Sequence, residues 1–193
     1  MLLKTKNLMK AFGGLKAINK VDFELPAGEI RGIIGPNGSG KSTFFNLVSG
    51  VYDPDPGSYI EFDGHDITNE PPHKIGALGL SRTFQLLRLY QDMSVINNVM
   101  SGYHTRVKYK FFDAVIGRKK IWDQEKEIKD EMMELLSFVG LADYAELNAS
   151  ELSGGQRRLL VLARAIAMKP KLLMLDEPAA GLSPVNVDNL MKI

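Results

Sequence analysis

The chain of 193 residues contains no cysteine, and its three histidines are His65, His73 and His104. Without cysteine there is no disulfide and no cysteine-ligated zinc, which fits a reducing compartment such as the cytosol. The histidines lack the paired spacing of a zinc site. These absences argue against a zinc protein and against a disulfide-stabilised secreted domain.

Long apolar runs and a surplus of one charge are missing as well. No run approaches the roughly 18 residues that a membrane span needs, and residues 1–6 lack the apolar core of a signal peptide. Lys and Arg total 24 against 23 for Asp and Glu, a net charge of +1, so a nucleic acid partner is not expected. The composition indicates one soluble globular domain, or one held at a membrane by a partner.

Apolar periodicity predicts strands in the first part of the chain and helices after it. Val21, Phe23 and Leu25 alternate with acidic residues, as in a half-buried strand. Further strands are expected at residues 30–34, 60–62 and 80–84, with a helix from the end of a glycine-rich loop to Val48. Helices are expected over residues 95–100 with Ser94 as cap, over 121–139 with a stop at Gly140, and between Ser153 and Pro170.

The apolar run at residues 172–175 predicts a central parallel strand. The chain is therefore expected to have two parts. Residues 1–85 and 153–193 form an α/β core, and residues 86–152 form a mostly helical insertion.

The glycine-rich loop fits the P-loop pattern, between a predicted strand and a predicted helix. Its residues are Gly35, Pro36, Asn37, Gly38, Ser39, Gly40, Lys41, Ser42 and Thr43. The glycines let backbone N–H groups turn toward phosphate oxygens, and the helix that follows adds the positive end of its dipole. Lys41 is expected to reach the β- and γ-phosphates of a nucleotide, and Ser42 to ligate Mg²⁺.

A carboxylate pair follows the apolar run at residues 172–175. Asp176 is expected to hold Mg²⁺, directly or through water, as the aspartate of a Walker B motif does. Glu177 is placed to polarise the attacking water as general base. Beside a P-loop, this acidic pair predicts nucleotide hydrolysis rather than a solvated turn.

The pentapeptide 152–156 predicts a second anion site. Ser153 offers a hydroxyl and could cap a helix, Gly154 and Gly155 permit close backbone approach, and Gln156 completes the segment. The N-terminus of the helix behind them favours negative charge. The alternative is a flexible helix cap. One phosphate cradle already exists at Lys41, so the second one suggests a γ-phosphate held by another subunit.

These motifs together resemble the ATP-binding cassette (ABC) family over essentially the whole chain. GPNGSGKST resembles its Walker A motif, LSGGQ its signature and LLMLDEP its Walker B motif. The resemblance places Gln85, 44 residues after Lys41 (85 − 41), at the glutamine that contacts Mg²⁺ or water, although it could be an ordinary polar residue. It also places Phe12 where an aromatic stacks on adenine; the alternative is a core phenylalanine.

The resemblance implies a fold, a reaction and partners. The fold is α/β, a RecA-like P-loop NTPase core with a mostly parallel sheet, an N-terminal antiparallel β subdomain and an inserted helical subdomain. The cofactors are ATP and Mg²⁺, and two cassettes, identical or related, sandwich each ATP between one Walker A motif and the opposite signature. Transmembrane permease subunits and, indirectly, a periplasmic or extracellular solute-binding protein are the further partners, at the cytoplasmic face of the membrane.

A narrower similarity links the chain to ATPase subunits of branched-chain amino acid importers. It lies in Ser81-Arg82-Thr83-Phe84-Gln85, in residues 176–182 and in residues 12–17. Urea and amide importers share much of this pattern, so the solute is left open. The helical insertion is expected to receive a helix of the permease.

Two departures from the family pattern bear on activity. Ser183 stands where the family usually has an aspartate, and no histidine follows His104, whereas the family carries a switch histidine beyond Walker B. The sequence also stops 16 residues after Glu177 (193 − 177), before the family's final strands and helices. Without that histidine and those strands, we expect this chain alone to bind ATP weakly and hydrolyse it poorly, and its sheet to have an uncovered edge. Two alternatives to an importer ATPase remain: a soluble cassette ATPase acting on nucleic acid or ribosomes, and an inactive nucleotide-binding fragment. The basic-aromatic residues 108–112 are expected to be a solvated face.

Overall fold

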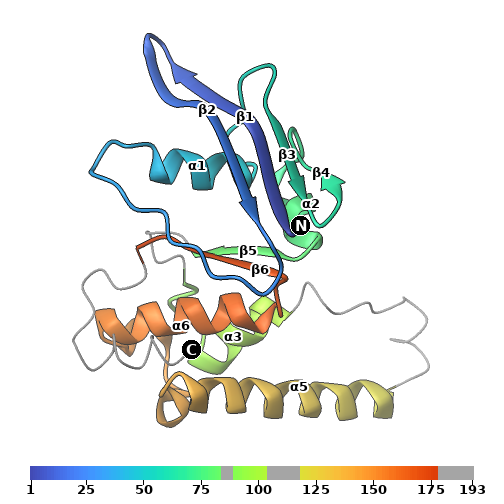
Figure 1. The fold of residues 1–193 in the computed structure, drawn as a ribbon. Coiled ribbons are helices and arrows are strands. Elements are labelled where there is room, and N and C mark those ends of the chain that lie inside the picture. The colour runs from blue at the N-terminus through green and yellow to red at the C-terminus, as the bar shows by residue number, and fades with distance from the viewer. Residues whose placement is uncertain (84–88, 104–117, 178–193) are drawn as a thin grey trace. The chain divides into compact units, whose positions relative to one another are not determined.

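The computed structural model describes residues 1–83, 89–103 and 118–177 (Figure 1). The chain divides into two compact units, which we call the N-terminal unit, Met1–Leu80, and the C-terminal unit, Ser81–Ile193. Each unit is described by itself.

The N-terminal unit is built on a four-stranded sheet with the order β2-β1-β3-β4 (Figure 1). The strands are β1 (Leu3–Phe12), β2 (Leu15–Leu25), β3 (Tyr59–Phe62) and β4 (His65–Asp66), and the helices are α1 (Lys41–Val48) and α2 (Pro72–Ala77). Every pair of neighbouring strands is antiparallel. The expected N-terminal antiparallel subdomain is thereby confirmed.

A two-residue turn joins β1 to β2. Phe12 pairs with Leu15 across Gly13 and Gly14, and Gly13 adopts a φ of +58°. Left-handed backbone at such a turn matches the twist of the flanking strands, which is why glycine is favoured there. The hairpin brings Phe12 to the tip of β1.

The core of the N-terminal unit joins the sheet to α1. Leu8, Ile60 and Phe62 are fully buried on the sheet, and Leu47 is 1% exposed on the helix. The ring of Phe44 on α1 lies edge-on to Phe23 on β2, with 5.3 Å between centroids. Burial of these side chains fixes α1, and with it the end of the glycine-rich loop, against β2.

The strand expected at residues 30–34 is not found. These residues belong to neither sheet of the described chain, and Ile30 and Ile34 are 101% and 95% exposed. An apolar, β-branched run signals a buried strand only where neighbouring strands accept its backbone hydrogen bonds. The sheets of residues 1–83, 89–103 and 118–177 supply no such neighbour.

In the described part of the C-terminal unit, helices pack around an apolar core. They are α3 (Val95–Tyr103), α5 (Arg118–Phe138) and α6 (Gly154–Ala167), with 3-10 turns at Ala142–Tyr144 and Ala149–Glu151. Fully buried core residues come from all three helices, among them Val99, Leu136 and Leu160. The helices expected from periodicity are confirmed.

The expected helix ends are confirmed as well. Ser94 Oγ accepts a hydrogen bond from Asn97 N at 3.3 Å at the start of α3. Gly140, with a φ of +75°, follows the end of α5, and the Leu141 amide donates to Leu136 O at 2.7 Å. Because a left-handed residue lets the chain turn back on the last carbonyls, glycine is the expected stop.

Helices α3 and α6 cross at a point that requires glycine. A Cβ atom on Gly102 would lie 2.3 Å from the carbonyl oxygen of Arg164. Any side chain there would force the helices apart, because this oxygen belongs to the backbone. The crossing fixes the axis of α6, and therefore the place of its N-terminus within the unit.

Two short strands complete the described part of the C-terminal unit. β5 (Leu80–Thr83) and β6 (Leu172–Leu175) form a two-stranded sheet (Figure 1). Both strands were expected, but β6 is not a central strand within the described residues, and of its residues only Met174 is buried. The mostly parallel core sheet and the boundaries of the helical insertion at residues 86 and 152 stay predictions.

Candidate functional site: a P-loop, an acidic strand end and a second anion site

The P-loop begins as an exposed turn and runs into the first residues of α1. Ser39 N donates to Pro36 O at 3.2 Å, which closes the turn. The Lys41 ammonium lies over the loop and donates to Gly35 O at 2.8 Å and to Pro36 O at 2.9 Å. The structure thus places the lysine over the loop backbone, and its expected contact with nucleotide phosphates stays a prediction.

Two glycines of the loop have different physical roles. Gly40 has a φ of +91°, and a Cβ there would lie 2.5 Å from Ala17 O on β2. Gly38 also has a positive φ, +82°, but a Cβ there would meet nothing within 4 Å. Gly40 is therefore needed to seat the loop on the sheet, whereas Gly38 leaves open space beside the backbone.

The start of α1 has the chemistry of an anion site. Its first four N–H groups lack partners within the helix, so they favour a negative charge. The first turn contains no acidic side chain, and Ser42 is exposed there. The open space at Gly38, the Lys41 ammonium and these N–H groups fit the phosphates of a nucleotide.

Phe12 is a half-exposed aromatic at the tip of the β1–β2 hairpin. Its side chain is 44% exposed, and Tyr52 lies edge-on to it with 5.5 Å between ring centroids. The Lys10 ammonium is 5.6 Å from the ring centroid of Phe12. Phe12 is not a core phenylalanine, so part of its surface is left for stacking. Sequence reasoning missed Tyr52, whose signal is an exposed aromatic just after a helix.

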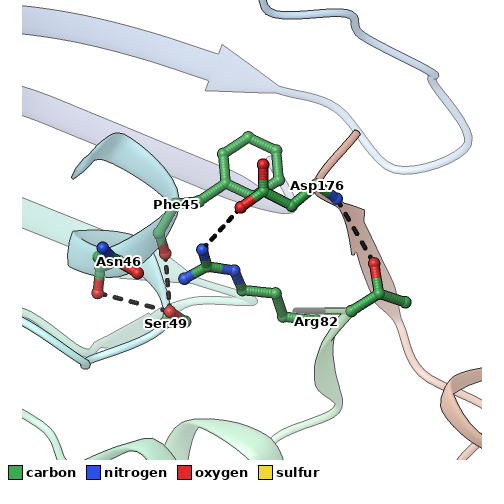
Figure 2. A network of polar contacts seen from close by, with 6 residues as sticks. Phe45, Asn46, Ser49, Arg82 and Asp176 are labelled. Atoms are coloured by element: carbon green, nitrogen blue, oxygen red, sulfur yellow. Dashed lines mark hydrogen bonds and ion pairs between the residues drawn. The ribbon is translucent and has the colours of Figure 1, made fainter. Parts of the chain in front are cut away.

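Asp176 follows β6 and is held by the neighbouring strand. Arg82 Nη2 donates to Asp176 Oδ2 at 3.0 Å, and the two side chains are 5% and 12% exposed (Figure 2). The Asp176 amide donates to Thr83 Oγ1 at 3.4 Å. Arg82 is a functional residue that the sequence motifs did not identify, although an arginine in a short strand is a signal for an ionic partner inside the protein.

Glu177 has an unusual backbone conformation. Its φ of +49° lies in the left-handed region, which costs a non-glycine residue on the order of 1 kcal/mol or more and is enriched at functional sites. The side chain is exposed. Glu177 is therefore an exposed carboxylate directly after the largely buried Asp176. This position suits a residue that activates water.

The residues of the second anion site form a helix cap. Ser153 Oγ accepts from Gln156 N at 3.3 Å, and Gln156 Oε1 accepts from Ser153 N at 2.8 Å. A Cβ on Gly154 would meet nothing within 4 Å. The cap is therefore reciprocal and ordered, and the backbone at Gly154 stays open to an approaching group.

Oxygen donors suited to Mg²⁺ occur in both units. Ser42 supplies a hydroxyl, and Asp176 supplies Oδ1, which accepts no hydrogen bond from the residues that the structure describes. Such hard oxygen ligands fit Mg²⁺, which is commonly held by one or two carboxylates plus substrate phosphates. Within residues 1–83, 89–103 and 118–177, no three His, Asp or Glu side chains form a metal cluster of their own. Gln85, the third expected ligand, lies outside the described residues.

In the described part of the chain, no helix combines the length and the apolar character that crossing a bilayer requires.

A P-loop, an acidic strand end and a capped helix with an open N-terminus define the class of P-loop nucleotide-binding proteins. Residues 18–180 match the sequence profile of the ABC transporter family. The chain belongs to this family, and it has the ABC cassette fold with an N-terminal antiparallel sheet.

Proteins similar to this chain occur in archaea and in bacteria. The probable branched-chain amino acid transport ATP-binding protein LivG of Archaeoglobus fulgidus is 45% identical over 188 residues, which cover 95% of this chain and 70% of that protein. The high-affinity branched-chain amino acid transport ATP-binding protein LivG of Escherichia coli K12 is 39% identical over 189 residues, 98% of this chain and 74% of that protein.

Solved structures give the same fold. The ADP conformation of MJ1267, an ATP-binding cassette of an ABC transporter, has a TM-score of 0.80 and 34% identity, and the match covers 99% of this chain and 74% of that one. The dimeric structure of MJ0796, a bacterial ABC transporter cassette, has a TM-score of 0.82 at 23% identity, covering 99% and 80%. The second likeness concerns the fold alone.

Proposed function

We propose that the chain is the ATP-binding and ATP-hydrolysing subunit of an ABC importer for branched-chain amino acids. The observation that carries the proposal is the P-loop at the start of α1, where the Lys41 ammonium lies within 2.9 Å of the loop carbonyls. The importer class is supported by the two LivG relatives named above, at 45% and 39% identity.

Nucleotide binding is assigned to the N-terminal unit. The exposed ring of Phe12 stacks on the base. The loop N–H groups and Lys41 hold the phosphates, in place of the carbonyls that Lys41 contacts in this structure. The full set of loop residues is Gly35, Pro36, Asn37, Gly38, Ser39, Gly40, Lys41, Ser42 and Thr43.

Hydrolysis is assigned to the residues after β6 and to Gln85. Ser42, Gln85 and Asp176 would hold Mg²⁺, which supplies neutralisation of the charge that develops on the phosphates. Glu177 accepts a proton from the attacking water, and Gln85 orients that water. Lys41 stabilises the transferring phosphoryl group.

The second anion site completes the active unit in a dimer. Ser153, Gly154, Gly155 and Gln156 face the γ-phosphate bound by another cassette, because the chain already carries one phosphate cradle. Closure on ATP and separation after hydrolysis would drive permease subunits of the importer. The protein is then peripheral, at the cytoplasmic face of the membrane.

The test is ATP-driven uptake by vesicles that hold the full-length protein with its permease and solute-binding partners. Lys41→Ala is expected to abolish ATPase activity and uptake of leucine, isoleucine and valine. Lys6→Ala, which removes an exposed ammonium from β1, is the matched control and leaves both unchanged. ATP turnover with no uptake of these amino acids would contradict the solute, and no turnover in the wild type would contradict the ATPase itself.

A further inference from the structure

The C-terminal unit contains a largely buried ion pair, Arg82 with Asp176, and the proposed function assigns the aspartate to Mg²⁺. Arg82 and Asp176 are 5% and 12% exposed, and their contact joins Nη2 to Oδ2 at 3.0 Å (Figure 2). Two residues so far apart in the sequence meet because β5 and β6 pair in one sheet. Among the described residues, the contacts that hold this carboxylate and its amide come from the strand beside it.

Burial at this level limits what the ion pair contributes to stability. Two buried charges lose much of their hydration, and replacing such a pair with apolar residues is often neutral or stabilising. A stability role alone therefore gives little reason to place an arginine there. Orientation gives a better reason, because a guanidinium is a rigid, always charged donor that fixes a carboxylate.

The contacts leave one oxygen of the carboxylate available. Arg82 occupies Oδ2, and Thr83 accepts from the Asp176 amide at 3.4 Å, so adjacent residues of β5 hold the side chain and the backbone. Oδ1 accepts no hydrogen bond from the described residues. Outer groups of this kind orient metal ligands, and changing one commonly costs about 10–100-fold in metal affinity.

We propose that Arg82 is a positioning residue for Asp176. Its guanidinium holds Oδ2 by a hydrogen bond, so that Oδ1 is presented to the Mg²⁺ of the bound nucleotide. This inference rests on the proposed function, since it is that function which brings nucleotide and Mg²⁺ to Asp176. It assigns Arg82 no contact with either of them.

Arg82→Met tests the proposal by comparing nucleotide affinity with and without the metal. ADP binding to the purified full-length protein is measured by calorimetry in EDTA and over a series of Mg²⁺ concentrations. We expect at least a tenfold lower Mg²⁺ affinity in the ADP-bound variant and an ADP affinity in EDTA within about twofold of the wild type. Arg82→Lys is expected to recover part of the loss. Lys129→Met, which breaks the exposed ion pair to Glu146 in the same unit, is the control and behaves as the wild type.

Each result decides between roles. An unchanged Mg²⁺ affinity overturns the proposal, as does an equal loss in EDTA and in Mg²⁺, which would indicate a general effect on the fold. A higher Mg²⁺ affinity would mean that Arg82 competes with the metal, and it overturns the proposal too. Wild-type protein that binds no nucleotide in either condition would instead refute the proposed function.

A wild-type structure keeps the test independent of whether the variant folds. In crystals with Mg²⁺ and nucleotide, Arg82 Nη2 is expected to stay within hydrogen-bond distance of Asp176 Oδ2, with the metal or its water on the side of Oδ1. An Arg82 side chain that has left the carboxylate overturns the proposal.

Discussion

Ser153 and Gln156 satisfy each other's backbone N–H groups at the first turn of α6, through hydrogen bonds of 3.3 Å and 2.8 Å. Both residues belong to the segment that the proposed function places against the γ-phosphate of a partner cassette. The cap uses the amides of Ser153 and Gln156. The amides of Gly154 and Gly155, the Ser153 hydroxyl hydrogen and the Gln156 side-chain NH2 group are the donors that can meet an anion. The cap is thus a support for the second anion site.

Removing this cap is expected to destabilise the C-terminal unit. Ser153→Ala should lower the free energy of unfolding by about 1 kcal/mol, since the Gln156 amide loses its acceptor. Ser153→Asp, which keeps a capping oxygen, and Ser137→Ala, at an exposed position of α5, are the controls and should retain stability. Urea denaturation followed by circular dichroism measures the difference, and an unchanged midpoint for Ser153→Ala would show that the cap is not used.

Gly102 and Gly154 are expected to respond differently to the same added methyl group. Gly102→Ala places a Cβ 2.3 Å from Arg164 O, and forcing the two helices apart should cost about 1–3 kcal/mol of stability. Gly154→Ala meets open space and lies at the start of a helix, where alanine is the better helix former. Its stability should be equal or higher.

The functional consequence of Gly154→Ala separates the site from the fold. If the γ-phosphate of a partner cassette approaches this backbone, the methyl group should block ATP-dependent dimer formation in a protein that is fully stable. Light scattering with ATP under non-hydrolysing conditions measures the dimer. Normal dimer formation by Gly154→Ala would count against the second anion site.

The sequence predicted local structure well wherever a few neighbouring residues determine that structure. The helix from Lys41 to Val48 follows from a glycine-rich start and an apolar face, and the cap at Ser153 follows from a hydroxyl three residues before a glutamine. The stop at Gly140 required only a glycine able to adopt a positive φ. Each of these elements is decided within a few residues.

The sequence predicted poorly whatever depends on neighbours that are distant in the chain. Residues 30–34 have the composition of a buried strand, but pairing, not composition, makes a strand, and the described sheets do not include them. The pair of Arg82 with Asp176 was likewise missed, because no spacing rule links positions on two strands before their sheet is known. Tyr52 beside Phe12 is a third case of the same kind.

The aromatic pair Phe12 and Tyr52 predicts losses of nucleotide affinity that differ in size between variants. Phe12→Ala removes the stacking face and should weaken ATP binding by about 2- to 10-fold, given about 0.5–1.5 kcal/mol for an aromatic pair. Phe12→Tyr keeps the face and should bind as the wild type. Tyr52→Ala leaves Phe12 without its edge contact and should show an intermediate loss. Fluorescence titration with a labelled nucleotide measures all three, and equal affinity for Phe12→Ala would remove Phe12 from the base site.

Asp66 predicts a pH dependence of stability in the N-terminal unit. Its Oδ1 accepts from the Thr68 hydroxyl at 2.6 Å and from the Thr68 amide at 2.9 Å, and these hydrogen bonds lower the pKa of the carboxyl from its ordinary value of 3.8. Because the folded pKa lies below the unfolded one, folding favours the ionised form. The stabilisation is therefore complete above pH 3.8 and is lost as the pH falls through the lowered pKa.

Asp66→Asn should therefore be less stable than the wild type at neutral pH and should approach it in acid. The carboxylate is exposed, so solvent screening limits the difference at pH 7 to no more than about 1 kcal/mol. Thr68→Ser keeps the hydroxyl and serves as the control, with a wild-type pH profile. Thermal unfolding from pH 7 down to about pH 3 measures the convergence, and carbon NMR titration of Asp66 reports the pKa directly. A stability gap that stays constant or widens in acid would contradict the sign, because the hydrogen bonds from Thr68 act on the ionised form.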